Sequence, residues 1–289
     1  MIKLIASDMD GTLLNGSHEV GKETVQAINE ARNAGIEVII ATGRSYKEAV
    51  VPLKNAGLSL PVVVVNGAEI RNEKGEQLYQ KGLTTQKANE AADALEQLDI
   101  YFEIYTEEGT YTNHREHGIQ LLIDIFLTSN PDTPLPHVKE EAENRYDEGH
   151  VHVVDDYHAV FSSSETVYKF LAFSSKPEKL EKAREVLNNL GGLAISSSGK
   201  ENLEITSADA QKGIALEWFI NQRGIDAEDV MAIGDNYNDV SMMKLAGWSV
   251  AMGNAPKDIQ EICRYVTSTN REEGVAKAIR KLTEIETKV

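Results

Sequence analysis

The sequence predicts an α/β protein in which a doubly wound parallel sheet forms the core and an α+β domain is inserted into it. Two observations lead to this prediction. Apolar runs of strand length alternate with helical stretches near both ends of the chain, and this pattern changes in the middle. We therefore expect residues 1–82 and 193–289 to form one core domain around an inserted domain of residues 83–192. With 289 residues, of which 41% are hydrophobic, the chain can fill a core in each domain.

The first core segment alternates strictly between predicted strands and predicted helices. Its strands are continuous apolar runs, as expected where helices cover both faces of a parallel sheet. Gly35 is placed to end the first helix, and Ser45 with Glu48 resembles a capping box that opens the second. In chain order the elements are a strand at 3–7, a helix at 22–33, a strand at 36–41, a helix at 46–56 and a strand at 62–65.

The same alternation returns after about residue 193, with a helix at 212–223, strands at 230–233 and 248–251, a helix at 239–246 and two closing helices. The middle of the chain contains amphipathic helices, a proline-rich loop at 129–136, a strand at 168–173 and a helix at 178–190. Residues 150–161 fit either a helix or a strand. We therefore expect the two ends to share one domain.

The charge balance and the single cysteine narrow the function classes. The 29 basic and 46 acidic residues give a formal charge of −17, which would repel polyanions and argues against nucleic acid or an anionic membrane as a partner. No apolar stretch approaches membrane-spanning length, and Cys263 has no second cysteine to pair with, so we expect a cytoplasmic protein. A small phosphorylated metabolite is compatible with this charge if its site is locally positive.

Two aspartates follow the first predicted strand directly. Asp8 and Asp10 stand two residues apart, and Gly11 allows a sharp turn, so both carboxylates should lie at the carboxyl end of the strand. One carboxylate could attack phosphorus as a nucleophile. The other could protonate the leaving oxygen as a general acid and later take a proton from water as a general base. Two such charges need a screening cation, and Mg²⁺ is the hard ion expected with oxygen ligands. By itself the pair is weak evidence, because Asp-x-Asp is common in turns.

Three further polar clusters lie where the same chemistry needs them. Thr42-Gly43-Arg44 ends the second strand with a hydroxyl, an accessible N–H and a guanidinium, all suited to phosphate oxygens. Lys212 opens a helix, where its ammonium could hold the nucleophile and offset charge on the transferring group. Gly234-Asp235-Asn236 follows another strand, and with Asp239 just beyond it supplies more carboxylate and amide groups.

Each cluster also has an ordinary structural interpretation. Thr42 could be a helix N-cap, Lys212 a solvated helix start, and Asp235 part of a turn. Together, however, four independent clusters fall at the carboxyl ends of parallel strands or at a helix start beside them, which is where open α/β sheets bind ligands. The joint pattern therefore favours a phosphoryl-transfer site.

These residues resemble a known family. Four segments resemble, in the same order along the chain, the four motifs of the haloacid dehalogenase-like superfamily. They are Asp8-Met9-Asp10-Gly11-Thr12-Leu13-Leu14, Thr42-Gly43-Arg44, Lys212 and Gly234-Asp235-Asn236-Tyr237-Asn238-Asp239. Asn66-Gly67-Ala68-Glu69 after the third strand, with the long insertion, makes the chain similar to the Cof-type sugar-phosphate phosphatases. In that branch the insertion is a cap over the active site. The inserted segment agrees with the branch only in position and length.

The resemblance implies a role for each matching residue. Asp8 would be the nucleophile, and Asp10 the general acid and base as well as a metal ligand through its backbone carbonyl. Asp235 would complete the Mg²⁺ site, with Asp239 supporting it. The implied phosphate contacts come from the Met9 N–H, Thr42, Gly43, Lys212 and Asn238. The guanidinium of Arg44 at the end of the second strand is a further expected contact. The implied reaction is hydrolysis of a small phosphate ester through an aspartyl-phosphate on Asp8.

Three other functions could use related residues. A sugar phosphomutase would use the same motifs and pass the phosphoryl group back to its substrate. A dehalogenase is disfavoured, because that chemistry in the superfamily lacks the second aspartate, and Asp10 is present. A phospho-accepting receiver module would be shorter, with its aspartate after a later strand. Sugar phosphates, nucleotides and a riboflavin-pathway intermediate all fit the predicted chemistry as substrates.

His150 and His152 have the spacing to share one face of a strand. They could be read as metal ligands, but no cysteine or further close histidine completes a set. A surface position in the inserted domain, or a contact with substrate, is the favoured interpretation.

Overall fold

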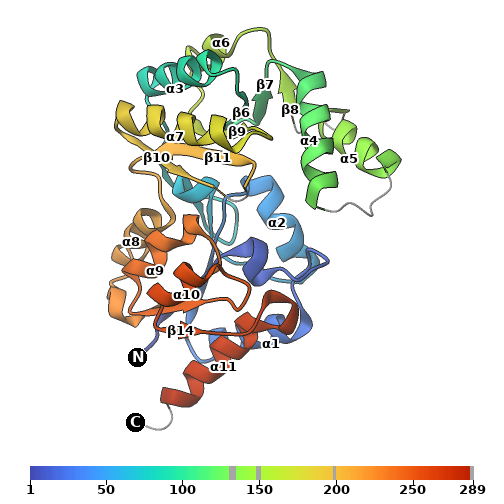
Figure 1. Cartoon of the computed structure of the whole chain (residues 1–289). Coiled ribbons are helices and arrows are strands. Elements are labelled where there is room, and N and C mark those ends of the chain that lie inside the picture. Colours follow the sequence, from blue (N-terminus) through green and yellow to red (C-terminus); the bar gives the residue numbers. More distant parts are fainter. Residues whose placement is uncertain (130–134, 148–150, 198–199, 287–289) are drawn as a thin grey trace. The chain divides into compact units, whose positions relative to one another are not determined.

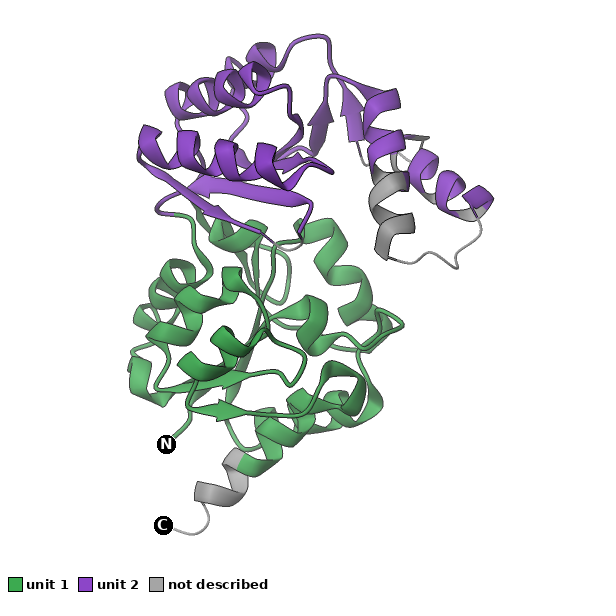
Figure 2. Ribbon diagram, viewed as in Figure 1, with its two compact units in different colours: residues 1–81, 210–289 green, residues 82–209 purple. Residues whose placement is uncertain are grey.

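The computed structural model describes residues 1–129, 135–147, 151–197 and 200–286 (Figure 1). The chain divides into two compact units (Figure 2). We call Met1–Lys81 with Ala210–Val289 the core unit, and Gly82–Asp209 the inserted unit. Each unit contains its own sheet and its own cluster of buried apolar residues. The predicted α/β class, with an insertion into a parallel sheet, is confirmed.

The core unit contains an eight-stranded sheet in the order β14-β13-β12-β1-β2-β3-β4-β5. The strands from β14 to β3 pair in parallel, and β4 and β5 add an antiparallel edge. The strand bounds are β1 Leu4–Ser7, β2 Glu37–Ala41, β3 Val62–Val64, β4 Glu69–Arg71, β5 Gln77–Gln80, β12 Val230–Gly234, β13 Trp248–Ala251 and β14 Tyr265–Val266. All the parallel strands except β14, which was not predicted, coincide with the apolar runs of the sequence.

Helices cover both faces of this sheet. The helices are α1 Lys22–Asn33, α2 Tyr46–Asn55, α8 Lys212–Asn221, α9 Val240–Leu245, α10 Lys257–Ile262 and α11 Gly274–Glu286. Residues of α8 and α9 share a buried cluster with Ile39 and Ala41 of β2. Since side chains alternate along a strand, Val38 and Ile40 point to the other face, and α1 packs there against β2 and α11. This is the doubly wound arrangement.

Two predicted helix signals are confirmed. Ser45 and Glu48 form the capping box that opens α2, with each side chain accepting a hydrogen bond from the backbone N–H of the other residue. Gly35 has a φ of +86° just beyond the end of α1, a conformation that costs glycine little.

The inserted unit has a six-stranded sheet in the order β10-β11-β9-β6-β7-β8, antiparallel except between β7 and β8. Its strands are β6 Tyr101–Thr106, β7 Thr110–Thr112, β8 Val151–Val153, β9 Val167–Phe173, β10 Leu193–Ser196 and β11 Asn202–Ser207. Its helices are α3 Thr85–Gln97, α4 Arg115–Ser129, α5 Leu135–Asp147, α6 Tyr157–Phe161 and α7 Pro177–Leu190. Apolar residues of α3, α6 and α7 share a buried cluster with residues of this sheet. The ambiguous stretch after residue 150 thus contains a short strand and a short helix.

The second boundary between the units differs from the expected one. The sequence placed it at residue 192, whereas the inserted unit continues to Asp209. β10 and β11 lie in this interval, and β11 pairs with β9 so that Ile205 stands opposite Phe170. Leu203 and Ile205 are buried in the cluster of the inserted unit. Their alternation with polar residues is the period of a half-buried strand, which was not among the predicted strands.

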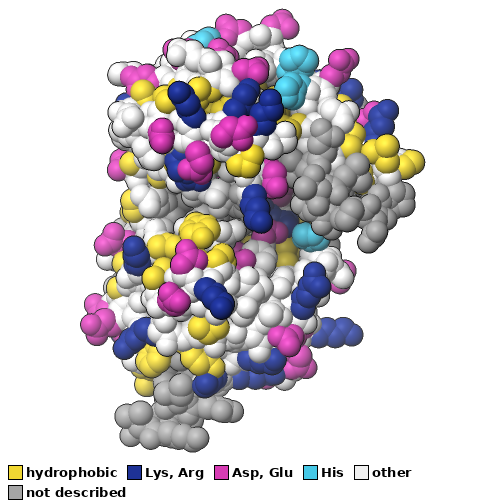
Figure 3. Space-filling model, viewed as in Figure 1, with side chains coloured by type: hydrophobic (Ala, Val, Ile, Leu, Met, Phe, Trp, Pro, Cys, Tyr) yellow, Lys and Arg dark blue, Asp and Glu magenta, His cyan; other side chains and the backbone are white. Residues whose placement is uncertain are grey.

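Two observations on the helices and the surface bear on possible partners. None of the described helices combines the length and apolar character needed to cross a membrane. On the face drawn in Figure 3, acidic and basic side chains are interspersed.

The boundary at Asp209 can be tested with two fragments of the inserted unit. We expect residues 82–209 to unfold cooperatively in urea. Residues 82–192 should show no cooperative transition, because they lack Leu203 and Ile205, each of which contributes about 1.5–3 kcal/mol by burial, and they leave the edge of β9 unpaired. Circular dichroism during urea titration measures both. Equal midpoints for the two fragments would contradict the boundary.

Candidate active site

The carboxyl ends of neighbouring parallel strands bring the predicted residues together. Asp8 follows β1, and Thr42 and Asp235 follow the adjacent strands β2 and β12. Because these strands are parallel, their carboxyl ends meet at one edge of the sheet, where open α/β proteins bind ligands. Lys212 begins α8 beside this edge, with its side-chain ammonium bonded to Asp8.

The backbone around Asp8 is fixed by hydrogen bonds. The Asp8 N–H donates to the carbonyl of Ile233 at 2.9 Å, which continues the pairing of β1 with β12. The chain then turns through Met9–Leu13, where Gly11 has a φ of +77°. A Cβ on Gly11 would lie 2.8 Å from Cγ of Asp235, so this turn requires glycine for its conformation and for the close approach of the carboxylate.

A buried ammonium connects two of the aspartates. Lys212 Nζ donates to Asp8 Oδ1 at 2.6 Å and to Asp239 Oδ1 at 2.7 Å. All three residues are buried. Asp239 Oδ2 in turn accepts the N–H groups of Asp235 and Asn236, each at 3.0 Å. Asp239 therefore positions both the lysine and the turn after β12.

The site holds more negative than positive charge. Burial, and next the repulsion from Asp239, raise the pKa of Asp8 well above its usual range. Burial and the charge of Asp239 also raise the pKa of Asp235 to about 6. Burial alone would lower the pKa of Lys212, but Asp239 and Asp8 outweigh this effect, and the pKa is raised. Three carboxylates thus face one ammonium, an arrangement that a further cation would stabilise.

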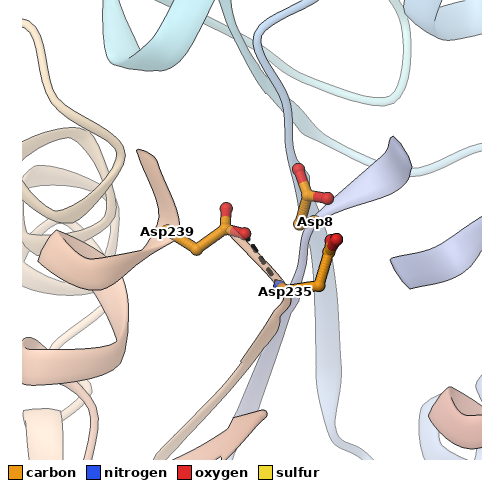
Figure 4. Close-up of side chains that lie close together, drawn as sticks. All are labelled: Asp8, Asp235 and Asp239. Atoms are coloured by element: carbon orange, nitrogen blue, oxygen red, sulfur yellow. Dashed lines mark hydrogen bonds between the residues drawn. The ribbon is translucent and has the colours of Figure 1, made fainter. Parts of the chain in front are cut away.

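The carboxylate oxygens are suited to a divalent cation. One oxygen from each of Asp8, Asp235 and Asp239 lies within 4.8 Å of the others (Figure 4). Carboxylate oxygens are the donors that hard divalent ions prefer. Asp239 Oδ1 accepts a hydrogen bond from the Lys212 ammonium, and its Oδ2 accepts two backbone N–H groups. Asp8 shares the ammonium through one oxygen, and Asp235 accepts from a hydroxyl and a side-chain amide, so Asp8 and Asp235 are the better ligands. The donor set fits such an ion.

Asp10 lies in a different environment from Asp8. Its side chain is 47% exposed, and both its oxygens accept hydrogen bonds from Arg44, with Nε–Oδ2 at 2.7 Å and Nη2–Oδ1 at 2.5 Å. The sequence assigned Arg44 to phosphate, whereas in the structure its guanidinium is paired with the second aspartate. The role of the Asp10 carbonyl as a metal ligand stays a prediction.

The other predicted phosphate contacts lie in the same unit. Thr42 is buried, and its hydroxyl accepts the N–H of Arg44 at 3.1 Å, while Gly43 between them is partly exposed. Met9 lies in the turn after Asp8, with its side chain buried. Asn238 is partly exposed, and its Nδ2 donates to Asn66 Oδ1 at 3.2 Å. Their contacts with a phosphate group stay predictions.

Two residues without a predicted role belong to the site. Thr12 Oγ1 donates to Asp235 Oδ1 at 2.8 Å. Asn254 Nδ2 donates to the carbonyl of Gly11 at 2.9 Å and lies 3.4 Å from Asp235 Oδ2. Asn254 follows β13, so the rule that drew attention to the other strand ends would have found it.

The predicted histidine pair is only partly described. His150 lies outside the described residues. His152 is exposed on β8, with its ring centroid 5.3 Å from that of Tyr111. Within the part of the chain that the structure describes, the group that could hold a metal is the aspartate cluster, and it does not include His152.

Comparisons with known proteins agree with this geometry. A family model described as haloacid dehalogenase-like hydrolase matches residues 5–279. Phosphatase YwpJ of Bacillus subtilis is 35% identical over 286 residues, which cover 97% of this chain and 100% of that protein. The 5-amino-6-(5-phospho-D-ribitylamino)uracil phosphatase YwtE of the same organism is 36% identical, with 97% and 98% covered. A solved haloacid dehalogenase-like hydrolase from B. subtilis superposes with a TM-score of 0.85 at 35% identity, covering 96% of this chain and 99% of that one.

Cation binding should depend on pH through Asp235. A carboxyl with a pKa of about 6 is mostly protonated at pH 5 and mostly ionised at pH 7, and a protonated carboxyl must lose its proton before it can bind a cation. We expect the association constant for Mg²⁺, measured by calorimetry, to rise at least about tenfold from about pH 5 to about pH 7, because Asp8, whose pKa is also raised, adds to the effect of Asp235. Asp235→Asn should bind weakly, and Asp10→Asn should keep the pH dependence. A pH-independent constant in the unsubstituted protein would contradict the assignment of Asp235 as a ligand.

Proposed function

The chain belongs to the haloacid dehalogenase-like hydrolase family, and we propose that it hydrolyses a small phosphate monoester with Asp8 as the nucleophile. The observation that carries this proposal is the buried Asp8, which is bonded to Lys212 and lies beside Asp235 at the carboxyl edge of the parallel sheet. The relatives described above are named as phosphatases, and the match covers nearly the whole length of each.

Mg²⁺ is the cation we propose for the aspartate cluster. Asp8 and Asp235 would hold it, with the Asp10 carbonyl as a further ligand. When bound, it would offset the charge of the carboxylates and of the phosphate oxygens. Thr12 and Asn254 would keep Asp235 in place through the hydrogen bonds they make to its two oxygens.

In the first half of the reaction, an Asp8 oxygen attacks phosphorus and the bond from phosphorus to the ester oxygen breaks. Asp10 donates its proton to the leaving oxygen. Lys212 holds Asp8 in place and offsets charge on the transferring group. The N–H groups of Met9 and Gly43, with Thr42, Arg44 and Asn238, would bind the phosphate oxygens.

In the second half, Asp10 takes a proton from water as the water oxygen bonds to phosphorus. The bond between phosphorus and Asp8 breaks, and inorganic phosphate leaves. For either step Asp10 must reach the substrate, and in the structure Arg44 occupies both of its oxygens. We therefore expect Arg44 to exchange at least one of these bonds for a phosphate oxygen when the ester binds.

A hydrolysis screen tests the proposed reaction and identifies the substrate. We expect purified protein with Mg²⁺ to release inorganic phosphate from sugar phosphates or related esters, and EDTA to abolish the release. The first ester to test is 5-amino-6-(5-phospho-D-ribitylamino)uracil, because it names the activity of the YwtE relative. Phosphate release that continues in chelator would contradict the metal assignment. Isomerised hexose phosphate in place of free phosphate would point to a mutase.

Substitution of each aspartate distinguishes their roles. Asp8→Asn should lose essentially all turnover, because an amide cannot form the acyl-phosphate. Asp10→Asn should slow hydrolysis of sugar phosphates by about 10²–10⁴-fold but affect an aryl phosphate less, because that leaving group needs no acid.

Rapid quenching with labelled aryl phosphate should trap label on Asp8 in Asp10→Asn and little in the unsubstituted protein. Label on another residue, or near-normal hydrolysis by Asp8→Asn, would falsify the covalent mechanism.

A further inference from the structure

The turn after β3 is strained. It comprises Val65, Asn66 and Gly67, with φ angles of +49°, +57° and +104°. All three residues are buried. A β-branched valine in this region is unusual, and non-glycine residues held there cost about 1–3 kcal/mol each. Strain of this size persists only where neighbouring contacts impose it, and such sites concentrate near function.

Hydrogen bonds connect this turn to the predicted phosphate loop. The Asn66 N–H donates to the Thr42 carbonyl at 3.0 Å, and the Val65 N–H donates to the Arg44 carbonyl at 2.9 Å. The Thr42 N–H itself donates to the Val63 carbonyl at 2.9 Å. The left-handed turn thus extends the pairing of β2 with β3 and fixes the loop on both sides of Gly43.

The same turn contacts two other segments of the site. A Cβ on Gly67 would lie 3.0 Å from the backbone nitrogen of Gln211, so the turn packs against the start of α8, where Lys212 stands. Asn66 Oδ1 accepts a hydrogen bond from Asn238 Nδ2 at 3.2 Å. One strained turn therefore contacts the phosphate loop, the lysine helix and the turn that carries Asn238.

We propose that Asn66 is a positioning residue that orients the carboxamide of Asn238 so that its NH₂ group, rather than its carbonyl, faces the phosphate. An amide NH₂ has two N–H donors. With one N–H bonded to Asn66, the rotation of the amide is fixed and the second N–H can donate to a phosphate oxygen. Without Asn66 the carbonyl could turn towards the phosphate, where two acceptors would repel each other. This inference rests on the proposed function, which assigns Asn238 to the phosphate.

A double-mutant cycle tests the proposal. Asn66→Gly removes the acceptor and retains a residue that adopts the left-handed conformation easily. We expect it to raise both the KM for p-nitrophenyl phosphate and the dissociation constant of inorganic phosphate by about tenfold, the loss of one hydrogen bond to a charged group. The kcat should change by less than about threefold, because the contact is made in the ground state as well as in the transition state.

The coupling between the two residues is the decisive measurement. In Asn238→Ala the effect of Asn66→Gly should vanish, so that the double variant binds phosphate within about twofold of Asn238→Ala. Effects that multiply would show that Asn66 acts through the backbone instead, and would overturn the proposal. Asn72→Gly in the exposed turn between β4 and β5 is the control for the substitution itself, and should leave phosphate binding unchanged.

Two further measurements separate the possible failures. If Asn66→Gly does not fold, the side-chain amide protons of Asn238 can be followed by NMR in the unsubstituted protein, identified by their loss in Asn238→Ala. One should shift when inorganic phosphate is added, and the proposal fails if phosphate binds and neither shifts. If the protein binds phosphate but hydrolyses no ester, the proposed function is contradicted. The double-mutant cycle can still be measured in that case, because it is read through the dissociation constant of inorganic phosphate.

Discussion

The buried ammonium of Lys212 is the interaction on which the rest of the site depends. It bonds to Asp8 at the end of β1 and to Asp239 after β12, and it opens α8. Burying a charge is costly unless it is paired, and here one ammonium pairs with two carboxylates. Removing it would leave two buried carboxylates without their cation. The sheet, the helix and the turn after β12 are therefore held together by the same contact that orients Asp8, the proposed nucleophile.

The parallel sheet brings the site residues together, and local backbone conformations complete their positions. Adjacent parallel strands end at one edge, but the chain must then turn sharply enough for each side chain to face the others. Gly11 permits this after β1 and brings the backbone against Asp235. After β3, Val65 and Asn66 adopt left-handed conformations that non-glycine residues rarely take. Of these two turns, the one after β3 is therefore strained, whereas glycine spares the one after β1.

The sequence predicted the parallel strands except β14, most helix starts and the aspartates and lysine of the cluster, because these depend on local period and on position at strand ends. It did not predict that Arg44 pairs with Asp10 or that Asn66 bonds to Asn238, since a side chain's partner depends on distant segments that only the fold brings close. The boundary at Asp209 was missed for a similar reason, because β11 is defined by its pairing with β9.

Two aspartates that stand two residues apart in the chain have environments suited to different tasks. Asp8 is buried against an ammonium, where its position is fixed and water has little access, which suits a nucleophile that must meet phosphorus at one angle. Asp10 is exposed and bonded to the Arg44 guanidinium, so its carboxyl is open to solvent. An acid that becomes a base within one turnover needs that access. Environment, rather than residue type, would separate the two proposed roles, as it does in other paired-carboxylate enzymes.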